Sequence, residues 1–154
     1  RKNLFSIILI IAFIIVSFIA IRNFLSLKDC ALVANFYVSL EQEIDSVWKS
    51  QSSEQIFSAT LPRGIISVCF GDLSQGKRGN VPEGVYEQLQ RNVIPKHNIF
   101  LYPTKYGCNL ASREILHLDI QKITQGKNPF CIESKGKINL KLEKGFYDSL
   151  VNIT

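Results

Sequence analysis

Residues 71–77 have the spacing G-x-x-x-x-G-K of a phosphate-binding loop and follow an apolar segment that we predict to be a strand. Such a loop surrounds phosphate with backbone amides and needs a helix to begin directly after the lysine. Here Arg78 takes the place of the hydroxyl residue that would hold magnesium, and Gly79 and Pro82 oppose a helix. We therefore interpret residues 71–84 as a polar surface loop.

Two histidines are the other candidates for catalysis. His117 is predicted on the outward side of a strand, beside Asp119, and His97 at the start of another strand. Their spacing to each other and to the cysteines indicates neither a metal site nor an activated nucleophile. We interpret both as solvated surface side chains, and we expect no enzyme activity, no cofactor, no metal and no small-molecule substrate.

The four cysteines are widely spaced and all follow the apolar N-terminal segment. A zinc site needs a close ligand pair such as C-x-x-C, and the sequence contains none. Two disulfides in an oxidising compartment fit this pattern, and four buried free thiols are the alternative. Three disulfide pairings are open among Cys30, Cys69, Cys108 and Cys131.

Residues 4–21 form a run of 18 uncharged and mostly apolar residues. At about 1.5 Å per residue, a helix of this length crosses a hydrocarbon core of roughly 30 Å. A buried helix of a soluble protein is seldom apolar on every side, and a cleaved signal has a shorter apolar region. We therefore predict a single membrane-spanning helix, and the flanking charges favour a cytoplasmic N-terminus slightly.

Glycine and proline are missing from the first 61 residues, since all nine glycines and all five prolines lie at or after Pro62. Nothing in this stretch is suited to breaking a helix, so we predict one helix over residues 3–50. Its second half is amphipathic, with an apolar stripe at helical spacing. The stripe predicted to face a sheet consists of Val33, Phe36, Tyr37, Leu40, Ile44, Val47 and Trp48.

After Pro62 the pattern changes to short strands between turn residues. We predict strands at 65–70, 98–102, 114–120, 130–133, 137–143 and 150–153, a weaker strand at 55–60, and a short helix at 85–92. Alternation places Leu116, Leu118 and Ile120 inward in one strand, and Ile138, Leu140 and Leu142 inward in another. The expected fold class is α+β, a long N-terminal helix packed on a small, mostly antiparallel β-sheet domain.

We divide the chain into a transmembrane or assembly helix, residues 1–28, and an extracytoplasmic domain, residues 29–154. In that domain the helix continues to about 50 and β-structure starts at about 55.

A helix that is apolar all round and then amphipathic, followed by a β-rich domain, resembles a type IV pilin, nearer the archaeal kind. The absence of methionine suits a chain trimmed by a prepilin peptidase. In that family the apolar half-helices leave the membrane and bundle into the core of a filament, with the β-domains on its surface. The resemblance therefore implies a structural subunit of a cell-surface filament that uses itself as partner and lipid before assembly. On this hypothesis the assembly helix is represented by Leu4, Ile8, Ile11, Ile15 and Phe18, and the helix-to-sheet and subunit junction by Val33, Phe36, Tyr37, Leu40, Ile44 and Trp48.

The alternative is a single-pass anchored extracytoplasmic domain that stays in the membrane and binds a partner or serves a larger complex. The net charge of +5 is spread along the chain without a basic stripe, so we expect no nucleic-acid partner. Asn152-Ile153-Thr154 is a glycosylation sequon that would matter on an extracytoplasmic domain.

Overall fold

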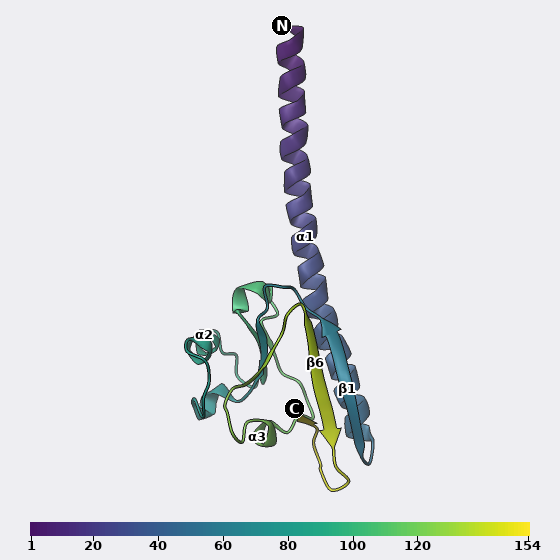
Figure 1. The fold of residues 1–154 in the computed structure, drawn as a ribbon, viewed down its shortest axis with the longest axis vertical. Helices are drawn as coiled ribbons and strands as arrows, with labels where there is room; N and C mark the ends of the chain where they lie inside the picture. Colours follow the sequence, from purple (N-terminus) through teal and green to yellow (C-terminus); the bar gives the residue numbers. More distant parts are fainter.

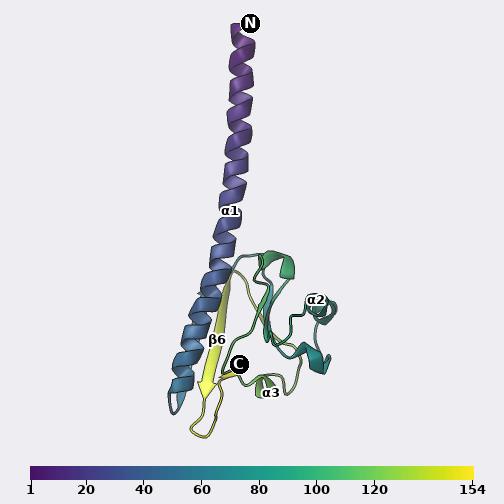
Figure 2. The ribbon, with the colours of Figure 1, turned by 180° about the vertical axis from the view of Figure 1, so that it is seen from behind.

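The computed structural model describes residues 1–154 except for the side chain of residue 2. Its largest element is helix α1, Lys2–Lys49, which runs for about 70 Å. Figures 1 and 2 show that its first half projects from the domain and its second half lies along β-strands. The absence of glycine and proline predicted one continuous helix, and the structure confirms it.

The C-terminal end of α1 is fixed by a lysine from a distant strand. The ammonium of Lys144 donates to the carbonyl oxygens of Trp48 at 2.6 Å and Ser50 at 2.8 Å. These carbonyls belong to the last turn, where a helix leaves acceptors without partners and where positive charge is favourable. The chain then leaves the helix at Ser50 in an extended conformation and turns into the first strand.

A three-stranded antiparallel sheet covers the second half of α1. Its order is β1 (Ser53–Thr60), β6 (Lys137–Lys144) and β7 (Asn152–Ile153). β1 pairs with β6 along its full length, with Phe57 opposite Leu140. Alternate residues of β6 are buried against the helix, as the sequence predicted. They are Ile138, Leu140 and Leu142.

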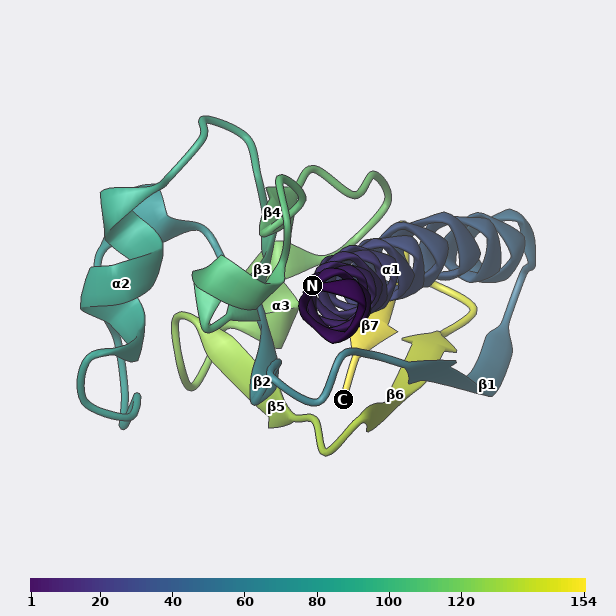
Figure 3. The same ribbon diagram turned by 90° about the horizontal axis from the view of Figure 1, so that it is seen from above.

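A second, four-stranded antiparallel sheet has the order β4 (Ser112–Arg113), β3 (Ile99–Tyr102), β2 (Ser67–Phe70) and β5 (Phe130–Glu133). One of its faces joins the main core with α1, and the other packs under helix α2, Val85–Arg91. Seen along the long helix in Figure 3, β2 and β3 lie between α1 and α2. Because both faces are covered, β2 is buried at all four positions.

The strand predicted at 114–120 is wrong. The side chain of Asn98 forms hydrogen bonds with both backbone groups of Ile115: its amide nitrogen donates to the carbonyl oxygen and its oxygen accepts from the N–H, each at 2.8 Å. The backbone then turns at His117, where φ is +67°. A short helix α3, Ile120–Ile123, follows, with the Asp119 carboxylate accepting from its backbone. The predicted inward positions consequently fail in part. Leu118 is buried, Ile120 is half-buried and Leu116 is 63% exposed.

The strand predicted at 130–133 is confirmed with the same bounds as β5, and the other remaining predicted elements are present with shifted ends. Two single-turn helices complete the chain: η1, Leu73–Gln75, within the predicted polar loop, and η2, Thr104–Tyr106, after β3. The weak strand prediction at 55–60 corresponds to the eight-residue β1, whereas β7 holds only two of the four predicted residues. The fold is α+β, with the long helix packed on antiparallel sheets.

Candidate membrane and assembly surface

The projecting half of α1 stands clear of the rest of the domain (Figure 1), and its apolar side chains are exposed all round the helix. The five residues predicted for the assembly helix are each between 51% and 66% exposed: Leu4, Ile8, Ile11, Ile15 and Phe18. The segment is long and apolar enough to cross a membrane, and none of its most apolar window is buried within the chain. Since an apolar surface of this size is unstable in water, lipid or other helices must cover it.

The second half of α1 is covered on one side by its own domain. Val33, Phe36, Tyr37, Leu40 and Ile44 are at most 1% exposed and belong to the main core. The ring of Phe36 lies 6.1 Å from that of Phe57 in β1. These five residues therefore join helix to sheet within one chain. The opposite side of this half of α1 is exposed.

That opposite face, which we call the outer face, carries short and uncharged side chains. Between Asp29 and Glu41 the sequence has no charged residue. Val38 is 47% exposed at the centre of the face. The exposed members of the outer face within this charge-free stretch are Ala31, Asn35, Val38 and Ser39. Beyond it, α1 carries the exposed Glu43 and the ion pair of Lys49 with Asp45.

The first disulfide ties the helix to the domain where the two halves of α1 meet. Cys30 in α1 is bonded to Cys108, which follows η2 and is 78 residues away in sequence. The backbone at Cys108 has φ of +55°. This bond decides among the pairings that the sequence left open. It also holds the 104–110 segment against the base of the projecting helix.

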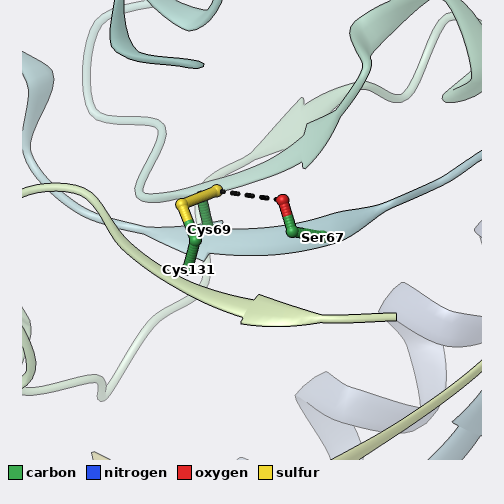
Figure 4. The surroundings of a disulfide bond; sticks show 3 residues. All are labelled: Ser67, Cys69 and Cys131. Carbon is green, nitrogen blue, oxygen red and sulfur yellow. Dashed lines mark hydrogen bonds between the residues drawn. A yellow bond between two sulfur atoms is a disulfide. The ribbon is translucent and has the colours of Figure 1, made fainter. Parts of the chain in front are cut away.

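The second disulfide crosses the four-stranded sheet. Cys69 in β2 and Cys131 in β5 are directly opposed in the antiparallel register and are bonded (Figure 4). The Ser67 hydroxyl lies 3.7 Å from the Cys69 sulfur on the same strand. This bond faces α2 and reinforces the smaller core. Disulfides persist in oxidising compartments, so the pair indicates an extracellular domain.

A polar cluster that sequence reasoning did not find lies where α1 meets β4. Nε of Arg113 is 2.9 Å from a Glu41 carboxylate oxygen, and its guanidinium carbon lies 5.7 Å from the centre of the Tyr37 ring. Burial raises the pKa of Tyr37 well above its usual value, and the positive charge of Arg113 opposes that rise. Within the described residues the Tyr37 hydroxyl has no hydrogen-bond partner. The cluster holds α1 and β4 in register. It could not be predicted from a local sequence pattern, because Glu41 and Arg113 are 72 positions apart.

Trp48 and His117 are stacked at the far end of α1. Their ring centres are 3.6 Å apart and their planes differ by 12°. Trp48 Nε1 also donates to the Ser149 carbonyl oxygen at 3.1 Å. The interpretation of His117 as a solvated side chain is therefore wrong, because the turn at residues 116–117 brings its ring onto the indole. Trp48, predicted in the helix-to-sheet junction, is half-buried there.

The phosphate-loop spacing at 71–77 is a folded surface loop, as predicted. The Asp72 carboxylate accepts from the backbone and hydroxyl of Ser74, and Lys77 lies 3.8 Å from Glu87. Asn128, a buried residue that the sequence did not single out, donates to the carbonyl oxygens of Asp72 and Gly76 at 2.7 and 2.8 Å. These contacts pair the polar groups of the loop within the chain, and no helix begins directly after Lys77, since α2 starts only at Val85.

An open hollow of about 790 Å³ lies between this loop, residues 93–98 and α3. His97, predicted as solvated, is half-buried at its edge, with Nδ1 2.8 Å from the Ser112 hydroxyl. Nowhere in the part of the chain that the structure describes do three or more His, Cys, Asp or Glu side chains gather as a metal site would require.

Asn152, the predicted glycosylation site, lies in β7 opposite Glu143 and is only 9% exposed. A glycan needs an accessible side chain, so this placement in the folded domain argues against modification.

No protein-family model matches the chain, and neither a curated protein nor a solved structure is significantly similar to it. The features of the molecule that bear on its function are a bare apolar half-helix, an uncharged outer face on the second half of α1, and a disulfide-bonded domain.

Proposed function

We propose that this chain is a pilin-like structural subunit that is held in a membrane by the first half of α1 and polymerises with copies of itself. The observation that carries this proposal is the outer face of the second half of α1. Its exposed residues lie beyond the membrane segment, yet none of them is charged between Asp29 and Glu41.

A helix that packs on a domain and faces water usually carries charged side chains on its exposed side. The outer face is uncharged over three turns, and the exposed Lys28 and Asp29 separate it from the apolar surface of the projecting half. Short side chains such as Ala31 and Ser39 let helices approach closely. A bundle of copies would cover both the projecting half and this face, while a lone anchor would cover only the former.

A single-pass anchored domain that serves a partner is the second candidate. The observation that favours it is the charge at the base of the domain, where Arg22, Lys28 and Asp29 are exposed on α1. Charges at this height suit the headgroup region of a bilayer. In a helix bundle, each of them would need a partner on a neighbouring subunit.

The deciding experiment shears cells that express the chain and examines the released fraction by electron microscopy and mass spectrometry. Filaments containing the chain support the proposal, and a chain released only by detergent supports the anchored domain. Val38→Asp places a charge on the outer face outside the membrane segment. We expect this variant to insert and fold normally but to form no filaments.

The matched control is Ile56→Asp, which adds the same carboxylate at a 74% exposed position of β1, and it should assemble. Ile15→Asp, in the projecting half, should also abolish filaments while the domain remains folded. Normal filaments from Val38→Asp would show that the outer face is not an assembly surface.

A further inference from the structure

The end of the domain from which α1 projects, which we call the basal face, is built from three segments. They are the turn at 61–66, η2 with its flanking residues, and the turn at 134–137. Backbone hydrogen bonds of 2.7–3.1 Å join the two turns to each other and to β3 just before η2. Figure 1 shows all three at the level where the helix leaves the domain.

Close packing keeps the basal face rigid. A Cβ atom at Gly64 would lie 2.6 Å from the ring of Tyr106, so only glycine lets this ring lie over the turn. Lys105 places its ammonium 4.7 Å from the centre of the same ring. The Cys30–Cys108 bond then ties η2 to α1. Tyr106 remains 42% exposed and Ile66 55% exposed on this face.

The basal face is positively charged. Its exposed basic residues are Arg63, Lys105, Lys135 and Lys137. Lys135 lies 3.7 Å from Glu133, with both side chains more than 80% exposed. Elsewhere in the described chain, no carboxylate lies within 4.0 Å of the other three cations.

Three lysines farther from the membrane segment form ion pairs with carboxylates. Lys49 is paired with Asp45 at 2.6 Å, and Lys122 with Asp148 at 3.2 Å. Lys141 contacts both Glu54 and Glu143. These three lysines are therefore paired with carboxylates, whereas Arg63, Lys105 and Lys137 on the basal face are not.

The membrane segment fixes the height of the basal face. If residues 4–21 cross the hydrocarbon core, the core ends near Arg22. Cys30 lies eight positions beyond Arg22 along the helix, a distance of about 12 Å. Headgroups occupy part of that distance, and charges interact across a Debye length of about 8 Å at physiological salt. The basal face therefore lies within electrostatic reach of the bilayer surface.

We propose that the basal face is a docking surface for the anionic lipid headgroups of the membrane that α1 spans. Arg63, Lys105 and Lys137 contact headgroup phosphates, and Tyr106 and Ile66 supply the interfacial aromatic and apolar contacts. Tyrosine is enriched at the membrane–water interface because its ring is apolar and its hydroxyl forms hydrogen bonds with water or headgroups. The inference rests on the membrane-resident state of the proposed subunit and is independent of polymerisation.

The test uses the full chain as a monomer in lipid nanodiscs of phosphatidylcholine, with or without phosphatidylglycerol. Amide hydrogen exchange is measured in the 61–66 and 103–107 segments. We expect exchange in both segments to slow severalfold when phosphatidylglycerol is present, and high salt to remove the effect. Equal exchange in the two lipids would overturn the proposal, whether or not the chain forms filaments.

The variant Arg63→Gln with Lys137→Gln should lose the slowing, while exchange within β2 and β6 reports that the domain stays folded. The matched control is Lys49→Gln with Arg91→Gln, which removes the same charge from α1's far end and from α2, and it should keep the slowing. Slowing that persists in the first variant, or disappears equally in the control, would contradict a specific basal face.

Discussion

Phe18 and Phe36 are residues of the same type in the same helix, yet one is exposed and the other is buried. Phe18 is 61% exposed on the projecting half of α1, and Phe36 is 1% exposed against the three-stranded sheet. Helix propensity is similar along the whole element, so the difference lies in what covers each half. One side of the domain half is covered within the chain, whereas the projecting half depends on lipid or other helices on every side.

The sharpest way to break this comparison is to truncate both phenylalanines. Phe36→Ala should lower the free energy of unfolding of the domain by about 3–5 kcal/mol, because it removes a packed ring and leaves a cavity. Phe18→Ala should leave that quantity unchanged. Urea unfolding in detergent micelles, followed by fluorescence of Trp48, the single tryptophan, measures both. Equal destabilisation by the two variants would mean that the projecting half packs on the domain.

A second prediction concerns the bond at the boundary between the halves. Replacing Cys30 and Cys108 by serine should lower the free energy of unfolding by about 2–4 kcal/mol, since the bond closes a long loop in the unfolded chain. Hydrogen exchange should rise at residues 104–110 while the core under α2 stays protected. The control pair, Cys69→Ser with Cys131→Ser, should show the reverse distribution of exchange.

The smallest expected effect is a pH dependence confined to the domain half, because residues 4–21 contain no ionisable side chain. The hydrogen bond from the Ser74 hydroxyl is the main cause that holds the pKa of Asp72 below its usual value, and the Ser74 backbone and the Gln75 side chain add to it. A carboxyl whose pKa is lower in the folded state stabilises the fold above its unfolded pKa, near 3.9, and loses that contribution as pH falls through the folded pKa.

Asp72→Asn should therefore reduce stability slightly at neutral pH and flatten the loss of stability below about pH 4. Urea unfolding at a series of pH values measures this. Parallel curves for the variant and the parent chain would show that Asp72 is not one of the groups responsible.

The features that were predictable from sequence are those with local causes. The unbroken α1 follows from the absence of glycine and proline, and the inward side of β6 follows from its alternation. The strand predicted at 114–120 had the same alternation, but Asn98 bonds the backbone of Ile115 from another strand and a turn follows. Tertiary contacts of this kind override the local pattern.

The candidate surface was predictable only in part. The apolar run at residues 4–21 predicted the projecting half of α1, because the exposure of that half depends on no tertiary contact. The basal face could not be predicted, because its basic residues come from three segments that are between 30 and 74 positions apart along the chain. The stack of Trp48 on His117 was missed for the same reason.

The boundary disulfide also determines how the molecule bears tension. When the projecting helix is pulled against the part of the chain that follows Cys108, the tension enters the domain at Cys30 and passes through the bond directly to Cys108. The 77 residues between them lie outside the covalent line of force and cannot be drawn out while the bond is intact. Only the chain beyond Cys108 can lengthen. Because β1, β2, α2 and β3 lie between the two cysteines in sequence, the bond protects them from being unfolded by this tension.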